Sequence, residues 1–276
     1  MRHILIQTVK EELKRKGFAP NKRLSQNFLV SQGPIVLLLK TADLQKEDWV
    51  LEIGPGLGVL TKELAKKANK VFAIEKDRGL ARSLKEELAP LSNVEVIEGD
   101  ILENLEVKLP SEYKVVANLP FSITGPVLRK FLGKLPRPRL LALLIQKEVA
   151  QRICAKPPNM SILALSVQYY AEPKIISLVK SGSFWPRPKV DSAIIRIIPK
   201  DLSSKEEVLA KTFFQVVKAG FSQPRKQLQN NLSKKLGLAK EKVFRLLNSL
   251  GIDPARRPST LSLSNWIELA KLYTMQ

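Results

Sequence analysis

The feature that most constrains the fold is the alternation, between residues 49 and 153, of short apolar runs with segments of helical periodicity. We expect strands at Trp49–Ile53, Val71–Ile74, Val94–Ile97, Lys114–Ala117 and Leu140–Ile145. We expect helices at Gly58–Ala68, Arg78–Leu88, Val127–Leu132 and Lys147–Ile153. Strands that alternate with helices at this spacing predict a parallel sheet covered on both faces, an α/β fold.

The pattern changes towards the C-terminus. Ser161–Tyr170 has helical spacing, and Lys174–Val179 and Ala193–Ile198 are predicted strands on either side of a proline-rich loop. Polar residues and a proline at Pro199–Ser204 then indicate a boundary. Every periodic segment beyond it is helical: Val208–Ala219, Arg225–Leu236, Lys240–Leu250 and Asn265–Leu272. We therefore predict a sheet domain over residues 1–200 and a smaller helical domain over residues 201–276.

The charge of the chain favours an acidic partner. The formal net charge is +20, yet residues 51–100 carry −1 while residues 101–276 carry +17. A positive charge of this size on both sides of one nearly neutral segment favours nucleic acid as the partner. The alternative, an anionic membrane surface, needs a basic amphipathic helix, and residues 4–16 are only a mild candidate.

Cysteine and histidine content and the absence of a leader pattern narrow the class further. A single cysteine excludes a disulfide framework. Because the chain also contains only one histidine, a structural zinc site is not expected, and we expect no metal. The apolar runs are far shorter than a membrane span, and no signal peptide is evident. We expect a cytoplasmic protein with no membrane partner.

A glycine loop follows the first predicted strand. The segment 52–58 reads Glu-Ile-Gly-Pro-Gly-Leu-Gly, which lets the backbone turn tightly and approach a ligand closely at Gly54 and Gly56. Dinucleotide binding expects G-x-G-x-x-G, whereas this loop is G-x-G-x-G with the acid Glu52 two residues upstream. An acid there suits a cationic or hydroxylated ligand better than a pyrophosphate. A simple tight turn is the alternative.

Two further acidic residues strengthen the prediction that the glycine loop binds a ligand. Glu75 ends the second strand, where a carboxylate can accept both hydroxyls of a ribose, and Asp100 follows the third, where it can accept from an adenine amino group. The carboxyl ends of adjacent parallel strands are where such folds bind ligands. Together, Gly54, Gly56, Glu75 and Asp100 predict S-adenosylmethionine binding, and hence the Rossmann-like sheet of the methyltransferases.

The residues after the fourth strand indicate the reaction. Asn118-Leu119-Pro120-Phe121 is similar to the N/D-P-P-Y/F motif of methyltransferases that act on exocyclic amino groups. The N6 lone pair of adenine is delocalised into the ring, so the nitrogen is a poor nucleophile. The Asn118 oxygen and a backbone carbonyl of the turn can hold it against the methyl donor, while Phe121 stacks on the base. The alternative is an ordinary Asn-Pro turn.

Six stretches in order carry a family resemblance over nearly the whole chain. They are residues 25–29 (Ser-Gln-Asn-Phe-Leu), the glycine loop, 118–121, 146–150 (Gln-Lys-Glu-Val-Ala), 184–192 and 219–226. The chain resembles the kasugamycin-sensitivity family of bacterial rRNA adenine dimethyltransferases. The family usually has tyrosine where this chain has Phe121, so a phenol in proton transfer is not expected here.

The resemblance implies an activity and a partner. It implies N6,N6-dimethylation of two adjacent adenosines in the 3′-terminal hairpin of 16S rRNA, in an immature 30S particle late in assembly. We expect a monomer. The resemblance also implies that residues 1–48 cover the cofactor site, and that Asn27 and Leu29 complete a cofactor-binding set with Gly54, Glu75, Asp100 and Asn118. It also places the Phe184 loop beside the active site, where this ring could cover the other face of the target base. Packing in the core is the alternative for Phe184.

Basic side chains of the helical domain are the candidates for RNA contacts. Arg225, Lys226, Lys234 and Lys235 form a compact set that we expect to meet phosphates. A solvated helix face is the alternative. Two other functions stay open at this point: a large-subunit rRNA methyltransferase of the erythromycin-resistance class, and a non-catalytic RNA-binding assembly factor.

Overall fold

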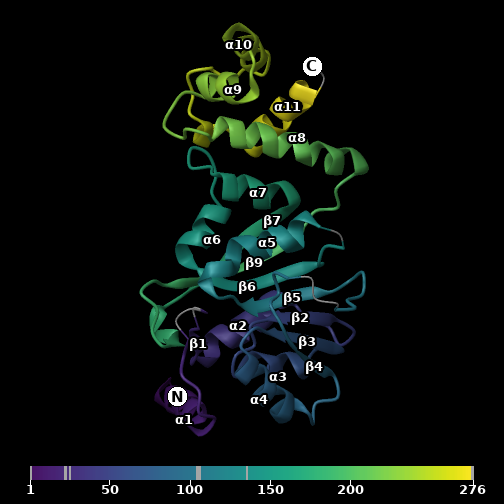
Figure 1. Ribbon diagram of the computed structural model, residues 1–276, viewed down its shortest axis with the longest axis vertical. Helices are drawn as coiled ribbons and strands as arrows, with labels where there is room; N and C mark the ends of the chain where they lie inside the picture. Colours follow the sequence, from purple (N-terminus) through teal and green to yellow (C-terminus); the bar gives the residue numbers. More distant parts are fainter. Residues whose placement is uncertain (1, 22–23, 25, 104–106, 135, 275–276) are drawn as a thin grey trace. The chain divides into compact units, whose positions relative to one another are not determined.

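A computed structural model describes residues 2–21, 24, 26–103, 107–134 and 136–274, which form two compact units (Figure 1). The first unit comprises residues 1–150 and 172–199, and the second comprises residues 151–171 and 200–276. The chain passes from the first unit to the second within helix α6 (Lys147–Ile153). Ser25 of the first family stretch lies outside the described residues.

A seven-stranded sheet forms the centre of the first unit, in the order β4-β3-β2-β5-β6-β9-β7. The strands are β2 (Trp49–Ile53), β3 (Lys70–Glu75), β4 (Val94–Glu98), β5 (Lys114–Asn118), β6 (Leu140–Gln146), β7 (Ala171–Val179) and β9 (Ser192–Pro199). Strands β4, β3, β2, β5 and β6 are parallel as expected, but β9 pairs with β6 in the antiparallel direction. The sheet is therefore mixed. The parallel arrangement predicted for residues 49–153 is confirmed, whereas the sequence analysis predicted no direction for β9, which returns beside β6 after the proline-rich loop.

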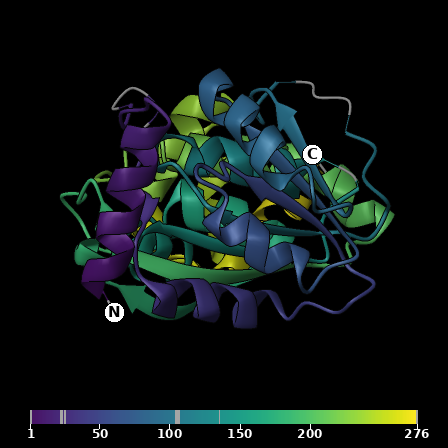
Figure 2. The same ribbon diagram turned by 90° about the horizontal axis from the view of Figure 1, so that it is seen from below.

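Successive residues of β5, β6 and β9 are buried, although they point to opposite faces of the sheet. Both faces of the central strands are therefore covered. Helix α2 (Gln32–Ala42) runs along β6 and β9 (Figure 2), and its Leu38 packs with Leu64 of α3 (Val59–Ala65) in one apolar cluster. The other helices of this unit are α1 (Arg2–Arg15), α4 (Arg78–Leu88) and α5 (Thr124–Gly133). Helix α2 was not predicted from the sequence.

A short two-stranded ribbon connects the N-terminal segment to the loop before β9. Strand β1 (Phe28–Leu29) pairs antiparallel with β8 (Phe184–Trp185), which sets Leu29 opposite Phe184. Val9 and Leu13 of α1 pack with Phe28 in a small buried cluster that also holds Val30, Leu57 and Leu80. Side chains of α1 and of residues 28–30 thus lie against the glycine loop and the start of α4.

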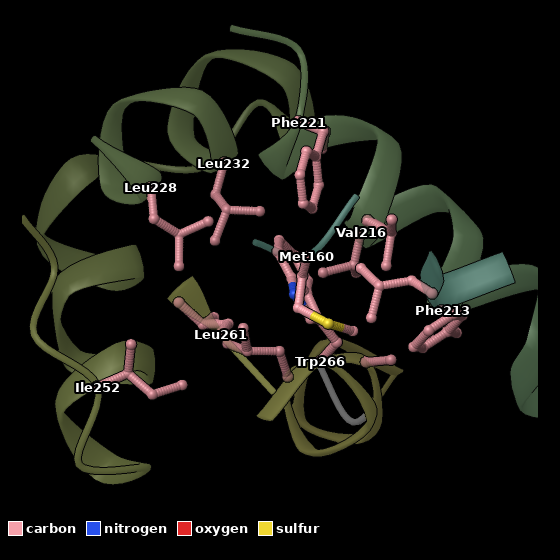
Figure 3. Packing of buried hydrophobic residues seen from close by; sticks show 14 of the residues in the cluster. Met160, Phe213, Val216, Phe221, Leu228, Leu232, Ile252, Leu261 and Trp266 are labelled. Atoms are coloured by element: carbon pink, nitrogen blue, oxygen red, sulfur yellow. The ribbon is translucent and has the colours of Figure 1, made fainter. Parts of the chain in front are cut away.

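The second unit is helical and has its own apolar core (Figure 3). Its helices are α7 (Ile162–Tyr170), α8 (Ser204–Gly220), α9 (Leu228–Leu236), α10 (Lys240–Ser249) and α11 (Leu263–Thr274). Trp266 of α11 is fully buried among side chains of α8 and α9, including Val216 and Leu232 (Figure 3).

Residues 151–171, which the sequence analysis placed in the sheet domain, group with residues 200–276 in the second unit. The physical reason is aromatic packing: the ring centroids of Tyr169 in α7 and Phe213 in α8 are 4.3 Å apart. The Tyr169 hydroxyl also donates to the Glu206 carbonyl at 2.7 Å. These contacts tie α7 to the C-terminal helices, although β7 and β9 follow it in the first unit.

Close packing of Trp266 against α8 yields a stability prediction. A Cβ atom at Gly220 would lie 2.3 Å from the Trp266 ring, which is buried and cannot move aside without disturbing the core. We expect Gly220→Ala to lower the free energy of unfolding by about 1–3 kcal/mol, measured as a lower thermal midpoint by circular dichroism. Gly133→Ala is the control, because nothing lies within 4 Å of the added atom. Equal midpoints for the two variants would contradict this account.

Candidate active site

One pocket in the first unit brings together the residues predicted to bind cofactor and target base. It lies at the carboxyl ends of the parallel strands, the edge at which α/β sheets bind ligands. The predicted residues that line it are Asn27, Leu29, Gly54, Gly56, Glu75, Asp100, Asn118, Leu119, Pro120, Phe121 and Phe184. Glu52, the acid upstream of the glycines, also lines the pocket, as do Phe28, Lys76 and Leu102, to which the sequence analysis gave no site role.

The polar side chains of the pocket follow the order of the strands. Asp100 comes after β4, Glu75 ends β3, Glu52 precedes the last residue of β2, and Asn118 ends β5. Because β4, β3, β2 and β5 are neighbours in this order, the four side chains form a row along one edge of the sheet.

The glycine loop lets other parts of the pocket approach the backbone closely. Gly56 has φ +59°, and a Cβ atom there would lie 3.2 Å from the Phe28 ring. Gly54 has φ +68°, with the Pro120 ring 3.6 Å from the corresponding position. Side chains at these two positions would be strained and would narrow the pocket. The tight turn and the close approach expected at Gly54 and Gly56 therefore both require glycine.

Glu75 holds the glycine loop by hydrogen bonds. Its Oε2 accepts from the Gly56 N–H at 3.0 Å, and its Oε1 accepts from the Asp77 N–H at 2.9 Å. Burial raises the pKa of the Glu75 carboxyl, while these two N–H donors act in the opposite direction. Each oxygen keeps a lone pair that can accept a ligand hydroxyl. Glu75 is buried, with only 6% of its surface accessible.

Asp100 is held at the end of β4 by two donors. Its Oδ2 accepts from Lys76 Nζ at 2.7 Å and its Oδ1 accepts from the Leu102 N–H at 2.9 Å. Partial burial alone would raise the pKa of this carboxyl, but the hydrogen bonds from Lys76 and Leu102 outweigh it and keep the pKa below its usual value. Asp100 is therefore an ionised acceptor at the rim of the pocket.

The reaction motif follows β5 and is fixed from two sides. The Asn118 Nδ2 donates to the Asn27 carbonyl at 3.2 Å, so the side-chain oxygen is oriented as the acceptor. The Leu119 N–H donates to the Leu144 carbonyl at 3.0 Å, and its side chain is buried. Leu119 can thus contribute only through its backbone. Phe121 begins a single 3₁₀ turn, η2 (Phe121–Ile123), and lies partly exposed in the pocket wall.

Phe184 lines the pocket and also packs in the core. Only 3% of its surface is accessible, and it belongs to the apolar cluster that contains Leu38 of α2 and Ile194 of β9. Most of the Phe184 ring is therefore used in core packing, which was the alternative to a role in base binding. The part facing the pocket remains for a ligand.

The predicted RNA-binding residues lie in the second unit. Arg225 and Lys226 are exposed in the loop before α9, whereas the sequence analysis placed them inside a helix. The helix begins later, at Leu228, because the buried Asn231 side chain donates to the carbonyls of Gly220 and Gln223 and holds this loop. Lys234 and Lys235 are exposed in the last turn of α9.

Comparison with known proteins agrees with this geometry. The family model described as ribosomal RNA adenine dimethylase matches residues 17–272. The chain belongs to this family. It is thus an S-adenosylmethionine-dependent rRNA methyltransferase with the fold expected from its sequence, a Rossmann-like α/β sheet with a helical C-terminal region.

Individual relatives of this dimethylase are similar over nearly its full length. A protein named ribosomal RNA small subunit methyltransferase A from Dehalococcoides mccartyi is 41% identical over 98% of this chain and 94% of its own. The crystal structure of a dimethyladenosine transferase from Plasmodium falciparum superimposes with a TM-score of 0.77 at 25% identity, covering 90% of this chain and 98% of that one. The 23S rRNA methyltransferase ErmE gives a TM-score of 0.72 at 27% identity, covering 89% and 98%.

The pocket of this dimethylase fits S-adenosylmethionine on two observations. The buried Glu52 carboxyl has an oxygen, Oε2, with no hydrogen-bond partner in the described protein, which leaves a polar group for a ligand. The space over Gly56, which a Cβ would fill against Phe28, lets a ligand approach the loop. The described residues bring together no group of three or more His, Cys, Asp or Glu that could hold a metal ion.

No helix in the described ranges has both the length and the apolar composition needed to cross a membrane.

Proposed function

We propose that this dimethylase transfers two methyl groups to N6 of each of two adjacent adenosines in the 3′-terminal hairpin of 16S rRNA. The observation that carries the proposal is the oriented Asn118 amide. Its nitrogen is bound by the Asn27 carbonyl, and its oxygen is left in the pocket beside Phe121 as an acceptor for an amino group. The similarity to relatives named small subunit methyltransferase A supports the choice of rRNA.

The chain's own residues act by positioning. Asn118 Oδ1 accepts one N6–H of the target adenine, a backbone carbonyl of the 118–120 turn accepts the other, and Phe121 stacks on the ring. Phe184, which also lines the pocket, covers the other face of the base. These contacts hold the N6 lone pair towards the methyl group, which lowers the barrier by orientation and electrostatics.

The cofactor lies along the row of strand ends. Glu75 accepts the ribose hydroxyls, Asp100 accepts from the adenine amino group, and Gly54 and Gly56 allow the backbone to approach. Asn27 and Leu29 cover the site from the N-terminal segment, where Gln26 Nε2 donates to Asp77 at 3.3 Å. S-adenosylmethionine supplies an electrophilic methyl group on a positively charged sulfur.

The substrate is an immature small ribosomal subunit, and the protein acts as a monomer in the cytoplasm. The net charge of +20 supports a large polyanionic partner. Extrusion of an adenine from a folded RNA costs a few kcal/mol, which stacking on Phe121 offsets.

The direct test is transfer of labelled methyl groups to immature and mature small subunits, followed by mapping of the modified bases. We expect incorporation of four methyl groups per immature subunit, all on two adjacent adenosines. Incorporation into large-subunit RNA would favour the erythromycin-resistance class. Binding without incorporation would favour a non-catalytic assembly factor.

The basic set of the second unit should contribute phosphate contacts. Each neutralised phosphate releases condensed counterions, so affinity falls with salt. We expect Arg225→Gln with Lys226→Gln to flatten the log–log salt dependence of binding to immature subunits by roughly one to two units. Cofactor affinity should not change.

A matched control is the pair Lys240→Gln with Lys242→Gln, two exposed cations on α10 of the same unit. This pair removes the same charge without touching the predicted set. A wild-type slope in the Arg225 and Lys226 variant would remove this loop from the RNA-binding surface.

A further inference from the structure

Helix α1 forms one side of the pocket. Its Val9 side chain lines the pocket and is buried with Leu13 in the small apolar cluster around Phe28 of β1 (Figure 1). The same cluster contains Leu57 of the glycine loop and Leu80 of α4. Release of α1 would therefore open the pocket wall next to the glycine loop.

The packing of α1 uses the face that a membrane would need. Residues 4–16 were a mild candidate for a helix on an anionic membrane surface. Val9 and Leu13 lie four residues apart on one side of the helix, and both are buried against the protein. The family model begins at residue 17, so the family match assigns no role to this helix. The apolar side of α1 is thus committed to the pocket wall.

Two cations hold α1 to the rest of the unit. Lys16, directly after the helix, donates to Glu87 in the last turn of α4 and also pairs with Glu12 at 3.1 Å. Lys10 lies over the ring of Trp185 in β8, with its Nζ 5.7 Å from the ring centroid. The helix is therefore tied to two separate segments, the end of α4 and the ribbon that carries Phe184.

The ion pair between Lys16 and Glu87 is partly shielded from water. The accessible fractions of the two side chains are 12% and 24%. Partial burial alone would raise the pKa of the Glu87 carboxyl, but hydrogen bonds from Lys16 and Lys62 outweigh it and keep the pKa below its usual value. Glu87 is therefore ionised at neutral pH and available to both lysines.

The second lysine on Glu87 offers an internal comparison. Lys16 donates to the Oε2 oxygen of the carboxylate, and Lys62 of α3 donates to its Oε1 oxygen. Lys62 thus links α3 to α4, whereas Lys16 links the N-terminal helix to α4. Removing either lysine takes one positive charge from the same carboxylate, but the two variants break different links.

We propose that Lys16 and Glu87 are positioning residues that hold α1, and with it Val9, against S-adenosylmethionine in the pocket. Closure by α1 excludes water from this wall and slows the release of the cofactor. When the ion pair opens, the helix keeps fewer contacts with the unit, so the open state is populated more often. The inference rests on the proposed function, which places the cofactor in this pocket.

Displacement of labelled S-adenosylhomocysteine, the demethylated cofactor, from the intact protein by excess unlabelled ligand measures the release rate. We expect Lys16→Met to release it about three- to tenfold faster than wild type, the effect of losing one partly shielded charge pair. Lys62→Met is the matched control, because it leaves the link to α1 in place. Its release rate should stay within about twofold of wild type.

The salt dependence of release separates positioning from a general loss of stability. Salt screens a partly exposed ion pair, so release from wild type and from Lys62→Met should accelerate with ionic strength. Release from Lys16→Met should accelerate less, whatever the thermal midpoint of this variant. In steady-state assays, Lys16→Met should raise the KM for S-adenosylmethionine more than it lowers kcat.

The contact between Val9 and the cofactor has its own matched pair of variants. Val9→Ala and Val30→Ala remove the same number of carbon atoms from the same buried cluster, but of the two side chains it is Val9 that lines the pocket. Both variants should lower the thermal midpoint. Val9→Ala should in addition weaken the binding of S-adenosylhomocysteine by about threefold or more, relative to Val30→Ala.

Equal release rates and equal salt dependence of Lys16→Met and Lys62→Met would overturn the proposal and leave the ion pair as a structural contact. Equal ligand affinities of Val9→Ala and Val30→Ala would overturn the contact of α1 with the cofactor. In both cases the wild type still binds the cofactor, so the proposed function stands. Failure of the wild type to bind either ligand would count against the proposed function, and against this inference with it.

Discussion

Replacing Asn118 by alanine should reduce the rate of methyl transfer by about 100-fold or more, a barrier increase of roughly 2.7 kcal/mol. The affinity for S-adenosylmethionine should stay within about threefold of wild type. The variant removes the oxygen that accepts the N6–H and leaves the nitrogen conjugated and poorly aligned. That loss acts on the transition state more than on either bound partner. Single-turnover transfer to immature small subunits, with cofactor binding measured by calorimetry, tests both statements.

Two further variants separate the roles of the Asn118 amide. Asn118→Asp keeps an acceptor oxygen but cannot donate to the Asn27 carbonyl, so we expect activity between those of alanine and wild type. Asn93→Ala is the control: its amide also donates to backbone carbonyls, those of Ala65 and Ala68, but lies outside the pocket. It should lower stability and leave turnover unchanged. Turnover of Asn118→Ala within about twofold of wild type, ~0.4 kcal/mol, would disprove the proposed mechanism.

The row of site residues could be predicted from sequence because each one is tied to the end of a strand. Glu75 and Asn118 follow runs of buried apolar residues, and parallel strands bring their carboxyl ends to one edge. No long-range information is needed for that step. The direction of β9 could not be found in this way, since an apolar strand reads the same in either direction.

Helix α2 escaped prediction for a related reason. Its residues 35–39 form an uninterrupted apolar run, which periodicity alone does not assign to helix or strand. Packing decides the matter: Ile35 and Leu38 lie against the sheet in the cluster shared with α3. The grouping of α7 with the second unit could not be predicted from local sequence either. Its helical pattern was recognised, but its partner, Phe213, lies more than 40 residues further along the chain.

The burial of Glu75 also could not be predicted from the local sequence pattern. The residues that enclose it come from distant segments, with the Gly56 loop on one side and the N-terminal segment, through Phe28, over that loop. A strand-end acid is recognisable from sequence, whereas its exposed fraction depends on what folds over it. The same holds for Glu52, which was noted as an acid upstream of the glycines but was not assigned to the site.

The burial of Glu75 changes what its removal should do. With both carboxylate oxygens bonded to the N–H groups of Gly56 and Asp77, alanine leaves two donors without partners in a buried site. Each such group costs about 1–3 kcal/mol, so Glu75→Ala should lower the thermal midpoint of the free protein. Relief of the desolvation that raises the pKa of Glu75 offsets part of this loss.

The larger effect of Glu75→Ala should be on cofactor binding. Loss of charge-assisted hydrogen bonds to the ribose costs on the order of 1.5–3 kcal/mol, and a loosened Gly56 loop adds to it, so the dissociation constant should rise by about 10–100-fold or more. Glu98→Ala is a matched control, because Glu98 lies opposite Glu75 in the β3–β4 register but is exposed and outside the pocket. Calorimetric titration with S-adenosylmethionine, below the melting temperature of each variant, measures the difference. A dissociation constant for Glu75→Ala equal to that of Glu98→Ala would show that the carboxylate only supports the loop and does not bind the ribose.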